Sequence, residues 1–179
     1  MNVVIRPGQS EDSVLLSELA MRSKGFWGYS DEFLELCRHE LTLNGTDVLI
    51  RRTAVAESCG TVVGFVTVDG TPPDGELGML FVAPEAIGGG IGTELFRHAL
   101  NTAHQAGFRR LAIESEPRAE PFYRAMGAVR IGSVASTLVP GRELPLMEVS
   151  TIPPFEQGTA RVPLDAMQDI ETDQGAGPP

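Results

Sequence analysis

The sequence predicts an α+β fold, with about four helices on a mixed, mostly antiparallel sheet of six to seven strands. Two strands around a glycine-containing turn form a hairpin at residues 47–69, and hairpin strands pair antiparallel. A strand, a helix and a further strand follow between residues 76 and 113, and such a crossover adds a parallel pair. Another pair of strands closes the pattern at residues 129–149. The length of 179 residues suits one domain with a sizeable core.

Polar caps and turn residues place the elements of the first half. A short strand at residues 3–5 is ended by Pro7 and Gly8. Ser10 and Ser30 are favourable N-caps, and each is followed by two acidic residues that suit the first turn of a helix. These caps predict one helix to about residue 24 and a second to about residue 41. The hairpin strands are then expected at residues 47–56 and 61–69.

Glycines separate the elements of the second half. A strand at residues 76–82 leads through a short turn to the glycines, and a helix then runs from residue 91 to about residue 105. A loop at residues 70–75 precedes this strand. Further elements are a strand at 111–113, a short helix at 119–126 and strands at 129–138 and 144–149. We expect the domain to span residues 1–153 and an extended or disordered acidic tail to span residues 154–179.

Charge and cysteine content limit the partners. A formal net charge of -10 and a pI of about 4.7 argue against nucleic acid and an anionic membrane, because both bind basic faces. We find no membrane-spanning run and no signal peptide. Cys37 and Cys59 form no C-x-x-C pair, which indicates reduced thiols and a cytoplasmic protein. The histidines His39, His98 and His104 lack metal-ligand spacing, so no metal is expected.

The glycines at residues 88–92 lie between a strand and a helix, which is typical of an anion-binding segment. Backbone N–H groups can converge on a phosphate there, and the helix dipole adds positive charge. A nucleotide-hydrolase loop requires a Lys that is absent here. A dinucleotide fingerprint requires glycine where this chain has Thr93 or Leu95. The remaining candidate is the coenzyme A cradle, Gln/Arg-x-x-Gly-x-Gly/Ala, at the start of a helix.

Two stretches match a known pattern in the same order. The first is Val82-Ala83-Pro84-Glu85 followed by Gly90-Ile91-Gly92-Thr93-Glu94-Leu95. The second is Ala119-Glu120-Pro121-Phe122-Tyr123-Arg124-Ala125-Met126-Gly127-Ala128, which is similar to Ala-x-x-Phe-Tyr-x-x-x-Gly-Phe. Over roughly residues 3–150 the chain thus resembles the GNAT superfamily of acetyl-CoA-dependent N-acetyltransferases. Its Ser-Lys-Gly-Phe-Trp-Gly-Tyr-Ser and Pro-Gly-Arg-Glu-Leu-Pro stretches resemble a bacterial subgroup with no assigned substrate.

The resemblance implies a GNAT-like fold and a site for acetyl-CoA as co-substrate. Backbone amides of residues 88–93 would bind the pyrophosphate, and backbone groups of Phe81 and Val82 would face the acetyl-pantetheine arm. Ile87 stands where the family usually has Gln or Arg. The residues assigned to the cofactor are Phe81, Val82, Ile87, Gly88, Gly89, Gly90, Ile91, Gly92, Thr93 and Tyr123.

Two side chains are assigned to proton transfer. Family members carry a Tyr at the position matching Tyr123, where a phenol near the sulfur can protonate the leaving thiolate. Glu76 can take a proton from the amine, directly or through water, and Glu114 and Glu116 are further candidates. Strand alternation is expected to place residues 76, 78, 80 and 82 on one face. The alternatives are that Tyr123 only packs and that Glu76 is a solvated strand-end residue.

The acceptor side is assigned to Trp27 and Tyr29, because in the family the loop between the first two helices covers the acceptor. Core packing is the alternative for Trp27, and Phe26 is expected in the core. The predicted function is N-acetyltransferase activity, in which a primary amine of a small molecule or peptide attacks directly. The alternative is a GNAT-fold module that binds CoA or another ligand without turnover. A homodimer is compatible with the sequence.

Overall fold

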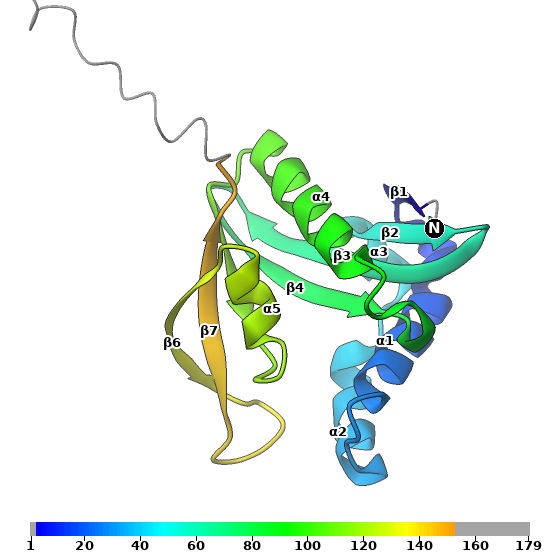
Figure 1. Cartoon of the computed structure of the whole chain (residues 1–179), viewed down its shortest axis with the longest axis vertical. Coiled ribbons are helices and arrows are strands. Elements are labelled where there is room, and N and C mark those ends of the chain that lie inside the picture. The colour runs from blue at the N-terminus through cyan, green and yellow to red at the C-terminus, as the bar shows by residue number, and fades with distance from the viewer. Residues whose placement is uncertain (1–2, 153–179) are drawn as a thin grey trace, which may run out of the picture.

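The structure, a computed structural model, describes residues 3–152, so the tail predicted at residues 154–179 lies outside the described residues. These residues form one seven-stranded sheet in the order β1-β2-β3-β4-β5-β7-β6 (Figure 1). All neighbouring strands pair antiparallel except β4 and β5, which confirms the predicted sheet. The strands are β1 (Val3–Pro7), β2 (Ala54–Ser58), β3 (Thr61–Thr71), β4 (Asp74–Val82), β5 (Arg110–Glu114), β6 (Val129–Ala135) and β7 (Glu143–Ser150).

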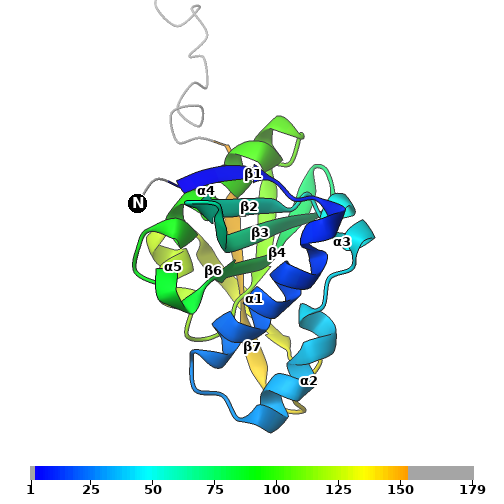
Figure 2. The ribbon, with the colours of Figure 1, turned by 90° about the vertical axis from the view of Figure 1, so that its right-hand side faces the viewer.

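Helices cover both faces of the sheet. α1 packs on β3 and β4 with α2 and α3 beside it, whereas α4 packs on β2, β3 and β4 from the other face (Figures 1 and 2). α5 lies on the α4 side, where its aromatic rings contact Phe96 of α4. The helices are α1 (Ser13–Gly25), α2 (Asp31–Leu41), α3 (Gly45–Ile50), α4 (Ile91–Gln105) and α5 (Glu120–Ala125), with 3₁₀ turns η1 (Ser10–Asp12) and η2 (Pro84–Ala86).

α3 replaces the first part of a predicted strand. The prediction of a strand over residues 47–56 is wrong for residues 47–50, which are helical, and only Ala54–Ser58 forms β2. A capping box explains the helix. Asn44 Oδ1 accepts from the Asp47 N–H at 2.9 Å, and the Asn44 N–H donates to Asp47 Oδ2 at 2.9 Å. This cap satisfies the backbone N–H groups of both Asn44 and Asp47, and it overrides the β preference of the apolar residues that follow.

The start of α4 is held close to the sheet. Leu95 and Phe96 of α4 are fully buried. Gly64 of β3 permits this packing, because a Cβ atom there would lie 2.9 Å from the Phe81 carbonyl oxygen and 3.0 Å from Cδ1 of Leu95. Both distances are shorter than ordinary van der Waals contact, so a side chain at Gly64 would push the helix away. The glycine segment before α4 is thereby fixed near the end of β4.

β4 contains one residue more than β3 in their shared ladder. Thr67 pairs with Met79 and Val68 pairs with Leu77, which leaves Gly78 as a β-bulge. The Thr67 hydroxyl accepts a hydrogen bond from the Met79 N–H at 2.9 Å and so satisfies a backbone donor at the bulge. A Cβ atom on Gly78 would lie 3.1 Å from that hydroxyl oxygen and closer still to a neighbouring ion pair. Only glycine therefore fits this position without displacing its neighbours.

The bulge makes the expected sharing of one face by residues 76, 78, 80 and 82 wrong. Gly64 of β3 faces α4, where it lies close to Leu95. Side chains alternate between the two faces along a strand, so Asp69, an odd number of residues after Gly64, faces α1. Glu76 pairs with Asp69 and therefore also faces α1. Val82 pairs with Gly64 and lies on the α4 side. One strand thus presents Glu76 to one face of the sheet and Val82 to the other.

β7, the other neighbour of β5 in the sheet, runs away from β4 (Figure 1), and β4 and β5 themselves pair only at one end. Their parallel ladder joins three pairs of residues, of which Glu76 and Ala112 are the last. β5 instead continues along β7, where Glu114 pairs with Leu146. Backbone pairing is lost on one side of β4 beyond Glu76, and we call this unpaired stretch between β4 and β5 the opening. The predicted loop at residues 70–75 is shorter than expected, because β3 extends to Thr71 and β4 begins at Asp74.

Candidate active site

The glycine segment ends at the N-terminus of α4. Gly88 and Gly90 have φ angles of 85° and 83°, which residues with side chains rarely adopt. Gly90 is the N-cap of α4 and no side chain caps the helix, so the N–H groups of residues 91–93 lack intrahelical partners. The helix dipole adds partial positive charge at the same place. Phosphate groups bind well to such a helix start.

The surroundings of the glycines leave room for a ligand. A Cβ atom on Gly88 or Gly90 would find no other atom of the described chain within 4 Å. Ile87, at the position where Gln or Arg was expected, has an extended backbone and is 37% exposed. Its apolar side chain cannot donate to a phosphate, so Ile87 offers no side-chain donor to an anion bound here.

Backbone groups at the end of β4 lie beside the glycine segment. The Ala83 N–H donates to the Val63 carbonyl at 2.9 Å. In an antiparallel strand, only every second residue forms backbone hydrogen bonds with a given neighbouring strand. Because Ala83 bonds to β3, the N–H and C=O of Val82 point away from β3 and toward the opening. A Cβ atom on Gly92 would lie 3.7 Å from Cγ2 of Val82 and 3.6 Å from Cζ of Phe122. The start of α4, the end of β4 and α5 therefore meet at this point.

Tyr123 lies in α5 at the same meeting point. It is 7% exposed, and its ring packs on Phe96 and Phe122 with centroid separations of 5.9 Å and 5.2 Å. Burial raises the pKa of its hydroxyl well above the ordinary value. The phenol therefore stays protonated at neutral pH, which suits a proton donor and excludes a proton acceptor.

Glu76 lies on the opposite, α1 face. Partial burial of its carboxyl group raises the pKa of Glu76, and the charges of Glu114 and Asp69 raise it further. Arg51 lowers the pKa of Glu76 but is itself held in a bidentate pair by Asp69, with N–O distances of 2.9 Å and 2.8 Å. Glu76 thus has a raised proton affinity, as a general base requires.

Tyr29 is the centre of a polar cluster on the α1 face. Its hydroxyl donates to Glu116 Oε1, and its ring packs on Phe33 of α2 at 4.7 Å. Glu116 also accepts from Lys24 Nζ at 3.4 Å and from Arg142 Nη2. Sequence reasoning considered Glu116 only as a base and missed both cations. Arg142 belongs to the Pro-Gly-Arg-Glu-Leu-Pro stretch, whose position after the closing turn was the available signal.

Trp27 lies at the surface beside this cluster. It is 44% exposed and packs edge-on against Phe26, which is 54% exposed, so the expectation of a core position for Phe26 is wrong. The Trp27 carbonyl accepts a hydrogen bond from Arg118, whose guanidinium group also lies 5.2 Å from the ring centroid of Tyr29. The structure thus brings Trp27 and Tyr29 together through Arg118, with Trp27 exposed and Tyr29 half-buried.

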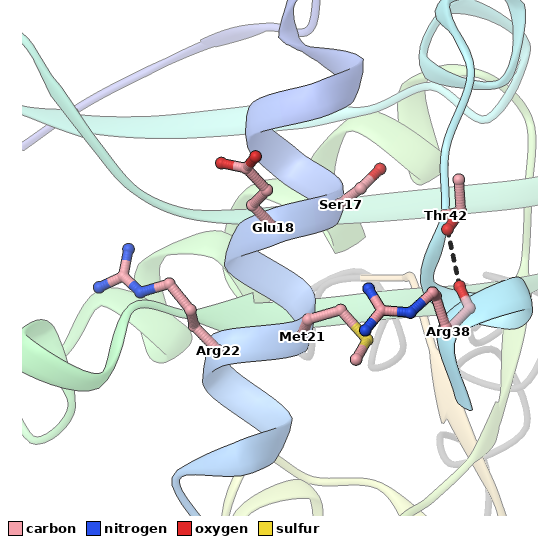
Figure 3. A pocket seen from close by; sticks show the side chains of 6 residues that line it. All are labelled: Ser17, Glu18, Met21, Arg22, Arg38 and Thr42. Carbon is pink, nitrogen blue, oxygen red and sulfur yellow. Dashed lines mark hydrogen bonds between the residues drawn. The ribbon is translucent and has the colours of Figure 1, made fainter. Parts of the chain in front are cut away.

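A depression between α1 and α2 lies apart from the predicted residues (Figure 3). Arg22 and Met21 extend from opposite sides of α1, and Arg38 extends toward Met21 from α2. The Thr42 hydroxyl donates to the Arg38 carbonyl at 2.7 Å across its edge. Arg22 pairs instead with Glu85. The depression contains no glycine, tyrosine or strand residue of the candidate site.

Three further properties concern the described part of the chain alone. Within residues 3–152, no three His, Cys, Asp or Glu side chains are grouped so that they could hold a metal ion. Over the same range, none of the helices has both the length and the apolar character needed to cross a membrane. Cys37 is buried and Cys59 is exposed, and both are free thiols.

Comparison with solved structures shows how widely this architecture occurs. A GCN5-related N-acetyltransferase from Rhodopseudomonas palustris superposes with a TM-score of 0.69 at 23% identity, covering 84% of this chain and 96% of that one. PaiA N-acetyltransferase from Thermoplasma acidophilum, in complex with coenzyme A, gives 0.65 at 21% identity, with 84% and 99% covered. YncA from Salmonella typhimurium, solved with its cofactor acetyl-CoA, gives 0.61 at 17% identity, with 86% and 96% covered. No curated protein matches the sequence significantly.

The family follows from the sequence itself. Residues 16–128 match the model of the acetyltransferase (GNAT) family, and this range includes the glycine segment, Glu76 and Tyr123. The chain therefore belongs to the acetyltransferase (GNAT) family. It has the GNAT fold, and structures of that fold include complexes with coenzyme A and acetyl-CoA.

Proposed function

We propose that the protein is an N-acetyltransferase that moves an acetyl group from acetyl-CoA to a primary amine by direct attack. The observation that carries the proposal is the divergence of β4 and β5. The opening joins an anion-binding helix start and Tyr123 on one face to Glu76 on the other. Two substrates could therefore approach from opposite faces and meet between the strands.

Each group has a defined task in this proposal. Acetyl-CoA supplies the acetyl group as a thioester. The N–H groups of residues 91–93 hold its pyrophosphate, and Glu76 takes a proton from the amine as the new N–C bond forms. The N–H of Val82 donates to the carbonyl oxygen as negative charge develops there. Tyr123 gives its proton to the sulfur as the C–S bond breaks, so CoA leaves as a neutral thiol.

Release of free thiol tests the proposal. We expect acetyl-CoA plus a suitable member of a primary-amine panel to give thiol and N-acetylated product in equal amounts. If CoA binds and no amine gives thiol, the alternative of a non-catalytic module that binds CoA or another ligand is correct. Thermal shifts with CoA, ATP and NAD separate a CoA site from a nucleotide site, because only the true ligand stabilises the fold by mass action.

Glu76→Gln is expected to lower kcat by about 100-fold, because the amide cannot accept a proton. In the unmodified protein the carboxylate must be ionised, so kcat falls as the pH drops through the raised pKa of Glu76. The variant loses this acidic limb of the kcat profile. Steady-state rates between pH 4 and 8 measure both effects, with the range set by the ordinary glutamate value of about 4.3.

Glu114→Gln is the matched control for Glu76. The charge of Glu114 raises the pKa of Glu76, so its removal should move the acidic limb to lower pH and leave the maximal rate in place. A Glu76→Gln variant with an unchanged rate and an unchanged limb would eliminate Glu76 as the base.

The remaining expectations belong to the same proposal. We infer a protein that acts in the cytoplasm on a small-molecule or peptide amine, without nucleic acid or membrane partners, and that needs no metal. The net charge of -10 supports the absence of nucleic acid and membrane partners, because nucleic acid and anionic membranes both repel an acidic protein. A homodimer stays compatible with the fold, and the boundary between a domain at residues 1–153 and a tail at 154–179 stays a prediction.

A further inference from the structure

Three cations surround Tyr29 on the α1 face. They come from three separate segments: Lys24 from the end of α1, Arg118 from the connection between β5 and α5, and Arg142 from the connection between β6 and β7. Their charged groups lie 5.8 Å, 5.2 Å and 6.0 Å from the centroid of the Tyr29 ring. Three distant parts of the chain therefore deliver positive charge to one place in an acidic protein.

The acidic side chains in contact do not balance these cations. Glu116 is the carboxylate that touches them, through Lys24 and Arg142. Arg118 donates to the Trp27 carbonyl and forms no ion pair within residues 3–152. Glu40 is a second carboxylate in these surroundings, because its charge acts on Cys37 together with those of Lys24, Glu116 and Arg142, so one of the three positive charges stays unmatched. The side chains of Lys24 and Arg142 are only 18% and 23% exposed, so water screens this excess incompletely.

The cluster borders the opening at which the amine would react. Glu116 lies two residues beyond Glu114, the last residue of β5, and two residues span at most about 7 Å of chain. Glu76 of β4 and Glu114 of β5 interact electrostatically, and these are the two strands that flank the opening. Moving away from the opening, the α1 face therefore changes from carboxylates to a cationic cluster.

We infer that the acceptor is an amine that also carries an anionic group, either a carboxylate or a phosphate. The ammonium end would lie beside Glu76 and Glu114, and the anionic end would bind Arg118 and Arg142. Arginine suits this task because its fork of N–H donors matches the oxygens of both anions. The inference rests on the proposed function and names the class of acceptor for it.

Matched amine pairs test this acceptor class with the full chain. Each pair differs by its anionic group alone: 4-aminobutyrate against butylamine, lysine against cadaverine, and phosphoethanolamine against ethanolamine. In the thiol-release assay we expect kcat/KM to be at least about tenfold higher for the anionic member of at least one pair, since charge-assisted hydrogen bonds are strong. Whether the carboxylate or the phosphate pair shows the larger ratio identifies the anion.

Arginine variants locate the effect. Arg118→Gln should raise KM for the anionic acceptor at least about tenfold, while kcat and the KM for the neutral member change little. Arg142→Gln should do the same, but it also loses its contacts with Glu116 and Phe33, so Arg118→Gln is the decisive variant if Arg142→Gln does not fold. Arg124→Gln is the charge-matched control, because Arg124 is exposed on α5 and pairs with Glu120.

The outcomes separate this inference from the proposed function. Thiol release that is equal within every pair, or faster with the neutral or cationic member, overturns the anionic acceptor and leaves the acetyltransferase intact. A preference for the anionic member that Arg118→Gln does not reduce also overturns it, because the anion then binds elsewhere. Absence of thiol release with every amine, together with CoA binding, overturns the acetyltransferase itself.

Discussion

Replacing Tyr123 with phenylalanine is expected to lower kcat by about 100-fold or more while CoA binding is retained. In the proposed mechanism the hydroxyl is the proton donor next to the meeting point of α4, β4 and α5, and phenylalanine keeps the ring that packs on Phe96 and Phe122. Single-turnover thiol release measures the chemical step, and calorimetric titration with CoA measures binding. In the variant the thiolate leaves without a proton, and this raises the activation free energy of the chemical step.

Stability and pH dependence distinguish this catalytic role from simple packing. The Tyr123 hydroxyl makes no hydrogen bond to residues 3–152, so its removal should leave the free energy of unfolding nearly unchanged. Because burial raises its pKa, the hydroxyl stays protonated in alkaline solution, and the unmodified enzyme should show no loss of rate from this group up to about pH 10, the ordinary tyrosine value. A Tyr123→Phe variant with full kcat would show that Tyr123 only packs.

Gly92→Asp is expected to weaken CoA binding by at least about tenfold, equivalent to about 1.4 kcal/mol, while the fold becomes no less stable. Gly92 is the second residue of α4, where the helix dipole favours a carboxylate and where glycine is a poor helix former. The same carboxylate repels a pyrophosphate bound to the N–H groups of residues 91–93. Calorimetric titration with CoA and thermal unfolding measure the two opposite effects.

Two further variants isolate the charge at this position. Gly92→Ala adds a Cβ atom at ordinary contact distance from Val82 and Phe122 without adding charge. Asn101→Asp adds the same charge at an exposed position of α4, about 13 Å further along the helix axis. Both should bind CoA nearly as the original chain does. Equal CoA affinity in Gly92→Asp would place the pyrophosphate away from the start of α4.

Local patterns predicted most of the fold, because their signals lie close together in the sequence. The helix expected from residue 91 to about residue 105 is confirmed as α4, since apolar residues recur on one face between a glycine N-cap and Gly107. α3 was missed because its apolar residues also suit a strand, and only the reciprocal contacts of Asn44 and Asp47 decide for a helix. The bulge at Gly78 depends on how β3 pairs, which one strand alone does not reveal.

In the candidate site, too, residues of contiguous motifs were predictable and residues that only the fold brings together were not. The glycine segment and Tyr123 belong to contiguous motifs, so sequence identified them as candidates. Arg118 and Arg142 meet at Tyr29 from segments far apart in the chain, and no spacing rule relates them. Surface aromatics such as Phe26 were misplaced because hydrophobicity alone does not distinguish a core residue from one that lines an accessible face.

The extra residue in β4 has a consequence for how two chemical partners can share one strand. A regular strand would send the side chains of Glu76, Leu80 and Val82 to the same side of the sheet. By inserting Gly78, the chain rotates the second half of the strand relative to the first. The bulge therefore turns Glu76 toward the α1 face and Val82 toward the α4 face. In the proposed mechanism, this single glycine lets the amine and the thioester approach the same strand from opposite sides of the sheet.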